Sequence, residues 1–476
     1  MKILFVEDNA GFAGDLRRAL GEIPGVTDVL TVADRESAIA ALKSDEIVDL
    51  VILDLAIPPS RKTDSARPEH GQSVFYDARN LRPGTPIFIL TGSEADKFSR
   101  GLAKFGNQVR LWGHSASFET VSYFLKEEVD ELLQRVTTMA ASFAKMNKVA
   151  INTRGKDLGL SPVQTRMLKS YANSVDCVAC DVSLLSGGLS DAKVVKATAL
   201  DSSYKPQALC AGKLGDRGII SSELQAYEKH VKKLGIGACP ALFCSIEDGV
   251  GLNGAIFYTL TDDDTLSLFD RLAKDASIGP RVVKNVRDAL GRWSEAATAG
   301  LVTVREIRSR LIADEDFESV TTKIDLSDVI GIEAIQLQSS MSCIHGDLHC
   351  GNILVKGNAD TVVIDFGDAG PGYTCLDPIS LELSLIFHPD AKKLGLRDGL
   401  IGNLETWPDI ELYSVADKLK PTVIACREWA HDVGGGDRSV LAAAYAYALR
   451  QLKYDTVDSD ITVRFLRHLA ERIRKG

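Results

Sequence analysis

Two short motifs in the C-terminal half combine side chains that can handle a metal-bound nucleotide. The first is H-G-D-L-H-C-G-N at residues 345–352, and the second is I-D-F-G-D at residues 364–368. Phosphoryl transfer needs a carboxylate that orients the acceptor hydroxyl and can take its proton, and Asp347 is such a group. It also needs ligands that hold magnesium against the phosphates, and Asn352 and Asp365 offer an amide and a second carboxylate. The two motifs therefore predict phosphoryl transfer.

The segment between the motifs predicts a β-hairpin. The apolar runs Ile353–Val355 and Val362–Ile364 flank the turn residues Lys356–Asp360, a pattern typical of two strands and their connection. We expect this hairpin to bring the first motif, before its first strand, close to the second motif at the end of its second strand.

The paired motifs resemble the aminoglycoside phosphotransferase and choline kinase branch of the protein-kinase-like fold, which has H-G-D where ordinary Ser/Thr kinases have H-R-D. The resemblance covers roughly residues 180–476 and implies a bilobal α+β domain that uses ATP and Mg²⁺. It implies that Asp347 is the catalytic base, that Asn352 and Asp365 bind magnesium, and that His345 supports the catalytic loop. His349 falls at a variable position, for which we expect no special role.

Residues 182–200 predict strand, glycine turn and strand ahead of the motifs. The turn can bring backbone N–H groups close to phosphate oxygens because its glycines tolerate unusual dihedral angles. Its residues, which we expect to bind the nucleotide, are Ser186, Gly187, Gly188, Leu189 and Ser190.

A strand at residues 208–213 ends in Lys213, and Glu223 opens a helical segment that Ser221 or Ser222 would cap. A lysine held on the phosphates and oriented by a helix glutamate is the kinase arrangement. Lys196 and Glu228 are the competing candidates. The apolar strand at 255–260 and the acidic turn at 262–264 then predict a hinge beside the adenine.

Residues 266–337 are mostly helical by pattern, and phosphotransferases of this branch form their acceptor pocket there. Asp377 matches the aspartate that braces the catalytic region in this family, and a helix N-cap is the alternative account. The last hundred or so residues predict amphipathic helices without recognisable chemistry.

Acidic and hydroxyl residues follow three apolar runs near the N-terminus. Glu7 and Asp8 follow residues 2–6, Asp54 follows 49–53, and Thr91 follows 86–90. Helical segments alternate with these runs, which predicts a doubly wound parallel sheet whose strands end at one edge. The four residues would gather there as a receiver-type magnesium site or as an adventitious cation site.

This pattern resembles the response-regulator receiver family over about the first 130 residues. The resemblance implies that Asp54 accepts phosphate from a histidine kinase or a small phosphodonor, that Glu7 and Asp8 help to hold magnesium, and that Thr91 is the switch hydroxyl. The family's lysine after the fifth strand has no counterpart behind residues 109–112. The glycine expected soon after Pro58 is displaced to Gly71.

Apolar residues recur at helical spacing from Phe118 to Met146 and predict a connector helix. Its stripe consists of Leu132, Val136, Met139, Phe143 and Met146. The stripe would form a homodimer or carry a signal, or it would pack on one of the domains. A glycine-containing linker at 151–161 follows.

Length and composition indicate a globular protein of several domains, and the two resemblances imply a role in signalling. The 476 residues are 45% hydrophobic and 25% charged, and we expect a receiver-like domain at 1–130, a connector at 131–175, an N-lobe at 176–262 and a C-lobe at 263–476. The net charge of −10 argues against nucleic acid or an anionic membrane as partner. No apolar run approaches the roughly 18 residues of a membrane span, and we expect a cytoplasmic location. The nine cysteines, with the C-x-x-C of Cys177 and Cys180, are interpreted as reduced structural residues.

The sequence thus predicts a receiver that controls an ATP- and magnesium-dependent phosphotransferase, which acts on an unidentified hydroxyl or amine acceptor. A fused receiver favours regulation over antibiotic detoxification. The alternative is a pseudokinase-like, nucleotide-sensing scaffold that recruits partners without phosphoryl transfer. The retained Asp347, Asn352 and Asp365 favour the enzyme.

Overall fold

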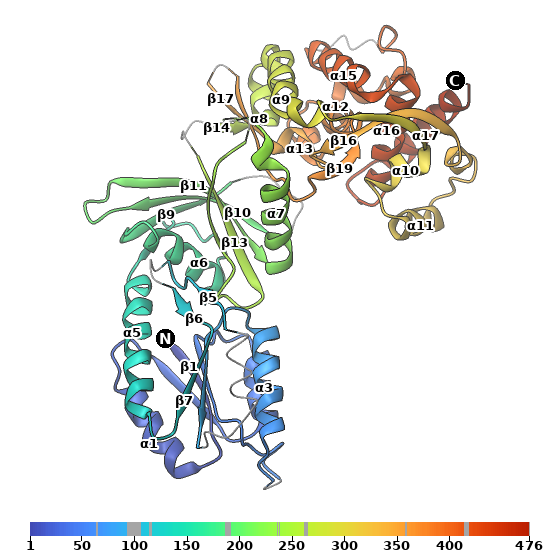
Figure 1. Ribbon diagram of the computed structural model, residues 1–476. Coiled ribbons are helices and arrows are strands. Elements are labelled where there is room, and N and C mark those ends of the chain that lie inside the picture. The colour runs from blue at the N-terminus through green and yellow to red at the C-terminus, as the bar shows by residue number, and fades with distance from the viewer. Residues whose placement is uncertain are drawn as a thin grey trace. The chain divides into compact units, whose positions relative to one another are not determined.

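The chain forms two compact units, drawn in the computed structural model of Figure 1. The structure describes residues 1–62, 65–92, 106–113, 117–185, 192–235, 237, 239–260, 265–357, 359–413 and 418–475. The first unit comprises Met1–Ser221 and Leu242–Thr261, and the second comprises Ser222–Ala241 and Asp262–Gly476. Among the described helices, none is both long and apolar enough to cross a membrane.

The first unit begins with a five-stranded parallel sheet whose strand order is β2-β1-β3-β4-β7. This is the doubly wound order in which the chain reverses direction beside β1. The helices α1 and α5 contribute to the core on one face, and α2 and α3 contribute to the core on the other. The strands are β1 (Lys2–Val6), β2 (Asp28–Val32), β3 (Leu50–Leu53), β4 (Ile87–Thr91) and β7 (Val121–Leu125), and the helices are α1 (Ala10–Gly21), α2 (Arg35–Lys43), α3 (Pro68–Leu81) and α5 (Val129–Asn147).

The sequence predicted the fifth parallel strand at residues 109–112, but the structure forms it at β7. β5 (Gln108–Val109) pairs only with β6 (Phe118–Glu119), whereas β7 pairs with β4 along its whole length. The expected helix from Phe118 is therefore wrong at its start, and α5 begins at Val129. Backbone pairing with β4 and burial of Phe124 outweigh the helical spacing of this segment.

The apolar stripe of α5 packs inside the first unit. All five of its residues are buried in the core that α5 shares with β1 and α1. The structure therefore favours packing on a domain over the coiled-coil dimer, because these side chains are already covered by their own chain.

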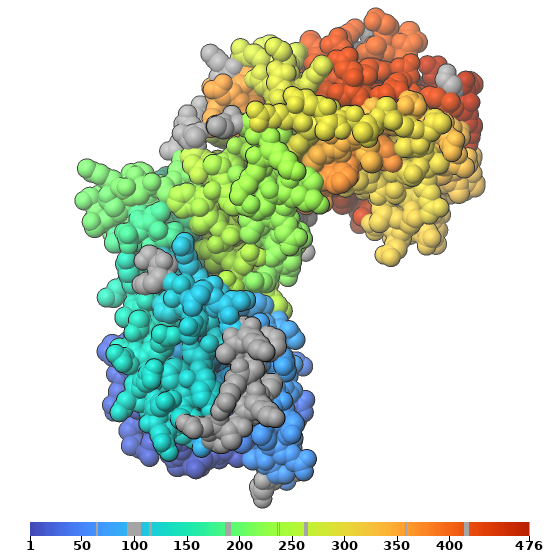
Figure 2. Space-filling view, viewed as in Figure 1, coloured from blue at the N-terminus to red at the C-terminus, as the bar shows by residue number. Residues whose placement is uncertain are grey.

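The first unit also contains a six-stranded sheet in the order β12-β13-β11-β10-β9-β8. The tip of the β10–β11 hairpin, residues 201–205, projects from the surface of this unit in green in Figure 2. The two strands of the predicted strand–turn–strand at 182–200 are confirmed by the antiparallel pairing of β9 and β10. The elements are β8 (Ala150–Asn152), α6 (Pro162–Asn173), β9 (Ala179–Leu184), β10 (Lys193–Leu200), β11 (Pro206–Asp216), β12 (Leu242–Ile246) and β13 (Asn253–Thr259).

An ion pair and hydrogen bonds connect the parallel-sheet region to α6. The Arg166 guanidinium forms an ion pair with the Asp49 carboxylate, whose other oxygen accepts from the backbone N–H of Lys2 at 2.7 Å. Asn173 donates from its amide to the carbonyl of Trp112 at 2.8 Å. These contacts make the two sheets parts of one unit.

The second unit is mainly helical and contains two small sheets, β15-β16-β19 and β14-β17-β18. The helix α7 begins at Arg217, so the predicted cap at Ser221 or Ser222 is wrong, and the Ser221 hydroxyl instead donates to the Glu247 carboxylate. The strands are β14 (Thr265–Ser267), β15 (Thr298–Thr303), β16 (Gln336–Ile344), β17 (Ile353–Lys356), β18 (Asp360–Val363) and β19 (Gly370–Tyr373). The helix α7 (Arg217–Lys229) begins in the first unit and continues into the second. The other helices are α8 (Leu268–Lys274), α9 (Gly279–Ser294), α10 (Val304–Ser309), α11 (Asp314–Lys323), α12 (Leu376–Phe387), α13 (Pro389–Lys393), α14 (Asp398–Ile401), α15 (Lys420–Gly434), α16 (Asp437–Gln451) and α17 (Ser459–Lys475).

Candidate phosphotransferase site

The predicted hairpin is present and joins the two motifs. β17 and β18 are antiparallel, with Ile353 opposite Val363. Below the hairpin, the Asn352 amide donates to the carbonyl of Asp347 at 2.9 Å, and the backbone N–H of Ile364 donates to the carbonyl of Asn352 at 2.9 Å. One network thus connects the loop of Asp347 to the strand that leads into Asp365.

His345 and Asp377 hold the catalytic loop from behind. The buried Asp377 carboxylate accepts from the backbone N–H groups of His345 at 2.7 Å and Gly346 at 3.0 Å. The His345 ring nitrogen Nε2 lies 3.0 Å from the carbonyl of Ile364. Asp377 is the second residue of α12, and its carboxylate is bound by the loop, so it braces the catalytic region and is not a helix cap.

Two backbone positions around the site have left-handed dihedral angles. Gly346 has φ +82°, and a Cβ atom there would lie 2.6 Å from the carbonyl oxygen of Asp368, so only glycine fits. Asp365 has φ +62°, a conformation that costs a non-glycine residue roughly 1–2 kcal/mol. Such strain often accompanies functional loops, because the surrounding structure fixes an otherwise unfavourable conformation.

Arg450 lies against the candidate base, and no sequence pattern pointed to it. Its Nη1 atom is 2.9 Å from Oδ1 of Asp347, and the two side chains are 21% and 30% exposed. Arg450 belongs to α16, one of the helices to which the sequence assigned no chemistry. Burial acts to raise the pKa of Asp347, but the charge and hydrogen bond of Arg450, together with His349 and His345, hold the pKa below its usual range.

His349 also contacts the base, contrary to expectation. Its Nε2 atom lies 3.7 Å from Oδ2 of Asp347, and its Nδ1 atom accepts from the backbone N–H of Gly351 at 3.0 Å. Burial lowers the pKa of His349 to about 4, so the ring is neutral near pH 7. The imidazole therefore shapes the loop without supplying a charge.

The predicted nucleotide-binding residues fall in different parts of the structure. Lys213 is buried within β11 of the first unit, where it lies opposite Ile256 of β13. Glu223 is buried in α7 and belongs to the second unit. The turn at 186–190 and the acidic hinge turn at 262–264 lie outside the described residues.

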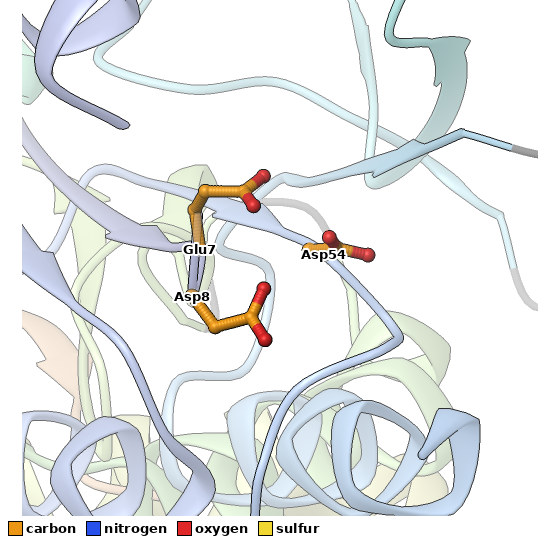
Figure 3. A group of neighbouring side chains, drawn as sticks. All are labelled: Glu7, Asp8 and Asp54. Carbon is orange, nitrogen blue, oxygen red and sulfur yellow. The ribbon is translucent and has the colours of Figure 1, made fainter. Parts of the chain in front are cut away.

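The acidic residues predicted near the N-terminus do come together. Figure 3 shows the carboxylates of Glu7, Asp8 and Asp54 as neighbours, and their ligand atoms lie within 4.8 Å of each other. Carboxylate oxygens are the ligands that magnesium prefers, so this set of donors fits that ion. Thr91 ends β4, the strand next to the one that leads into Asp54.

A lysine, Lys126, lies against this acidic cluster, although the sequence offered none behind residues 109–112. It follows β7, the true fifth strand, and its backbone N–H donates to the carbonyl of Thr91 at 2.8 Å. Its Nζ atom lies 2.7 Å from Oε2 of Glu7 and 2.7 Å from Oδ2 of Asp54. Burial acts to lower the pKa of Lys126, but its hydrogen bonds to the two carboxylates raise it overall, so the ammonium stays charged.

Gly71 contacts the backbone of the loop that follows Asp54. Its N–H donates to the carbonyl of Leu55 at 3.2 Å, and a Cβ atom at this position would overlap the backbone of Leu55. The displaced glycine therefore still lies against the residue next to Asp54.

The cysteines of the C-x-x-C are free and buried, and burial raises the pKa of Cys180 to about 12. Their thiols are therefore poor nucleophiles and poor metal ligands.

Comparison with known proteins gives one family match. Residues 222–394 match the phosphotransferase enzyme family. A thermostable mutant of the aminoglycoside phosphotransferase APH(4)-Ia in its apo form has a TM-score of 0.37 at 14% identity, over 62% of this chain and 94% of that one. Glucosamine kinase in crystal form A has a TM-score of 0.32 at 14% identity, over 66% and 82%.

No curated protein matches the sequence significantly. The residues that match the family contain both motifs and Asp377. The second unit therefore carries a phosphotransferase-family domain.

Proposed function

We propose that the second unit transfers the γ-phosphoryl group of ATP to a hydroxyl acceptor. The observation that carries this is the network through Asp347, Asn352 and Ile364, which fixes the two motifs to each other. The acceptor oxygen attacks the γ-phosphorus, a new P–O bond forms, the bond to ADP breaks, and the hydroxyl proton passes to the Asp347 carboxylate.

Asn352 and Asp365 are the residues that would hold magnesium in this domain. The amide nitrogen of Asn352 is committed to the carbonyl of Asp347, so its oxygen is the atom suited to a cation. Bound magnesium neutralises charge on the phosphates. The chain itself contributes position: Asp377 and His345 hold the loop, and Asp347 orients the acceptor.

The test is magnesium-dependent ATP consumption by the wild type, Asp347→Asn and Asp365→Asn. Asp360→Asn is the matched control, because this aspartate lies in the same hairpin but is exposed. We expect turnover to fall at least about 100-fold in the first two variants and to be unchanged in the control. Absence of wild-type turnover with every acceptor, water included, would instead support a nucleotide-sensing scaffold.

We further propose that the parallel-sheet domain is a receiver whose phosphorylation at Asp54 controls the phosphotransferase. The position of Lys126 between Glu7 and Asp54 favours this over an adventitious cation site, because the ammonium would also contact a phosphoryl group on Asp54. A histidine kinase or a small phosphodonor would supply the phosphate. Beryllofluoride should bind the wild type but not Asp54→Ala, and its binding should change ATP turnover. Binding without any change in turnover would refute the proposal that the receiver controls the phosphotransferase.

A further inference from the structure

The guanidinium of Arg450 occupies one oxygen of the candidate base. Its Nη1 atom contacts Oδ1 of Asp347 at 2.9 Å, so Oδ2 is the oxygen left for an acceptor hydroxyl. Both side chains retain partial exposure, 21% for Arg450 and 30% for Asp347. An acceptor that reaches the base therefore also meets the arginine.

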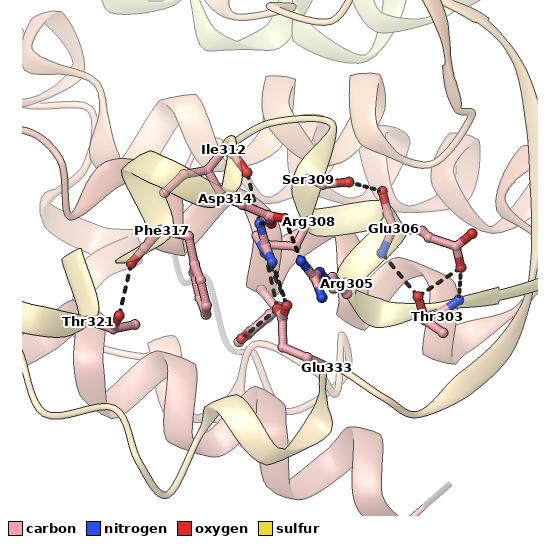
Figure 4. A network of polar contacts seen from close by, with 11 residues as sticks. Thr303, Arg305, Glu306, Arg308, Ser309, Ile312, Asp314, Phe317, Thr321 and Glu333 are labelled. Carbon is pink, nitrogen blue, oxygen red and sulfur yellow. Dashed lines mark hydrogen bonds and ion pairs between the residues drawn. The ribbon is translucent and has the colours of Figure 1, made fainter. Parts of the chain in front are cut away.

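The helix that carries Arg450 is fixed by a buried polar network. The Tyr445 hydroxyl of α16 donates to Oε1 of Glu333 at 3.1 Å. Glu333 also pairs with Arg308 at 2.7 Å, and the Arg308 side chain is only 1% exposed. Figure 4 shows Arg308 between Glu333 and Asp314, where it connects α10 to the start of α11. Arg450 therefore approaches Asp347 from a rigid element.

Arg450 is the charged partner of Asp347 in this part of the site. The neighbouring ring of His349 is neutral near pH 7, because burial lowers its pKa to about 4. The other titratable groups that act on the pair are His345 for Asp347, and Tyr447 and Tyr454 for Arg450. A cationic acceptor that reaches Asp347 would consequently also face the guanidinium of Arg450.

A cavity beside the end of α16 has a balanced lining. Its volume is about 410 Å³, within the range of small-molecule sites, and its wall includes Lys453 and Tyr454, just beyond Arg450. The charged lining residues are two acids, Asp316 and Asp455, and two lysines, Lys323 and Lys453. Lys453 pairs with Asp316 at 2.6 Å.

We propose that Arg450 is a positioning residue that restricts the phosphotransferase to uncharged or anionic hydroxyl acceptors. This rests on the proposed function. An ammonium next to the reacting hydroxyl would be repelled by the guanidinium, whereas a hydroxyl, carboxylate or phosphate group can accept its N–H groups. Arg450 thereby both orients Asp347 and selects the charge of the acceptor.

The experiment uses the full chain with three related sugars: glucose, glucosamine and glucuronate, which are neutral, cationic and anionic. In the wild type we expect kcat/KM for glucosamine to be at least about tenfold below the values for the other two. Arg450→Gln should abolish this difference, and Arg450→Lys should keep most of it. Arg438→Gln, on the same helix but bound to the carbonyl of Ile473, should behave as wild type.

If water is the acceptor that is used, the preference is measured by inhibition of ATP hydrolysis. Glucuronate should then inhibit at lower concentration than glucosamine in the wild type, and the two should become equal in Arg450→Gln. Wild-type use of glucosamine as good as glucose, or an unchanged ratio in Arg450→Gln, would overturn the inference alone. Loss of all magnesium-dependent turnover in the wild type would overturn the proposed function itself.

Discussion

Replacement of Lys126 by methionine tests the acidic cluster of the first unit. The ammonium lies 2.7 Å from both Glu7 and Asp54, whose side chains are 0% and 6% exposed. Methionine keeps most of the apolar stem and removes the charge. Because two buried carboxylates lose their cation, we expect the first unit to lose about 3 kcal/mol of stability near pH 7.

The loss should depend on pH with a definite sign. Burial raises the pKa of Glu7, and the hydrogen bond from Lys126 partly opposes that shift. Without the lysine, the pKa of Glu7 in the folded protein rises further above its unfolded value. The destabilisation is therefore complete above the folded pKa, and it shrinks as the pH falls through that pKa and Glu7 takes up a proton.

Magnesium should replace the missing ammonium if the cluster binds it. Binding at 100 times the dissociation constant restores about 2.7 kcal/mol. The wild type should gain less, since its lysine already neutralises Glu7 and Asp54 and must move to admit the ion.

The measurement is urea unfolding followed by hydrogen exchange in peptides that cover β1 and β3, near pH 7 and near pH 5, with and without magnesium. Lys145→Met is the control, because this lysine pairs with Asp176 on the surface, and we expect no measurable change. An equal loss at both pH values, or equal stabilisation of variant and wild type by magnesium, would refute the electrostatic reasoning.

Three further outcomes follow from other contacts. Arg166→Met and Asp49→Asn should each destabilise the first unit by about 3 kcal/mol, and the double variant by little more; additive losses in urea unfolding would contradict a coupled buried pair. Gly71→Ala should lower stability by about 1–3 kcal/mol, measured by thermal unfolding, because its methyl group overlaps Leu55; a neutral result would contradict this packing. The lowered pKa of Asp347 predicts that turnover persists at acid pH until the pH falls below the usual aspartate range. The stability from its ion pair is fully present above the unfolded pKa and is lost as the pH falls through the folded pKa. A pH–rate profile with an acid limb near neutrality would contradict this.

The sequence by itself determined the parts of the site that lie close together in the chain. The hairpin follows from two apolar runs and a turn, and its strands β17 and β18 form as predicted, because local pairing of neighbouring segments needs no information from elsewhere. Local alternation of strands and helices likewise placed Glu7, Asp8 and Asp54 at one sheet edge.

The tertiary structure decided which of two segments became the fifth strand, and with it which lysine reaches the acidic cluster. Residues 109–112 and 121–125 are both short and apolar. The helical spacing from Phe118 onward even favours a helix over a strand for the second segment. Pairing with β4 is what makes residues 121–125 the strand. Because Lys126 follows this strand, its ammonium can pair with the carboxylate of Asp54.

Arg450 was beyond sequence reasoning for a related reason. A single arginine on an amphipathic helix is usually solvated, and nothing in its neighbours marks it. Its role depends on the packing of α16, which Tyr445 and Glu333 fix. Spacing along the chain thus determined which groups could do chemistry, whereas long-range packing decided which charges face them, since burial and ion pairing depend on segments far apart in sequence.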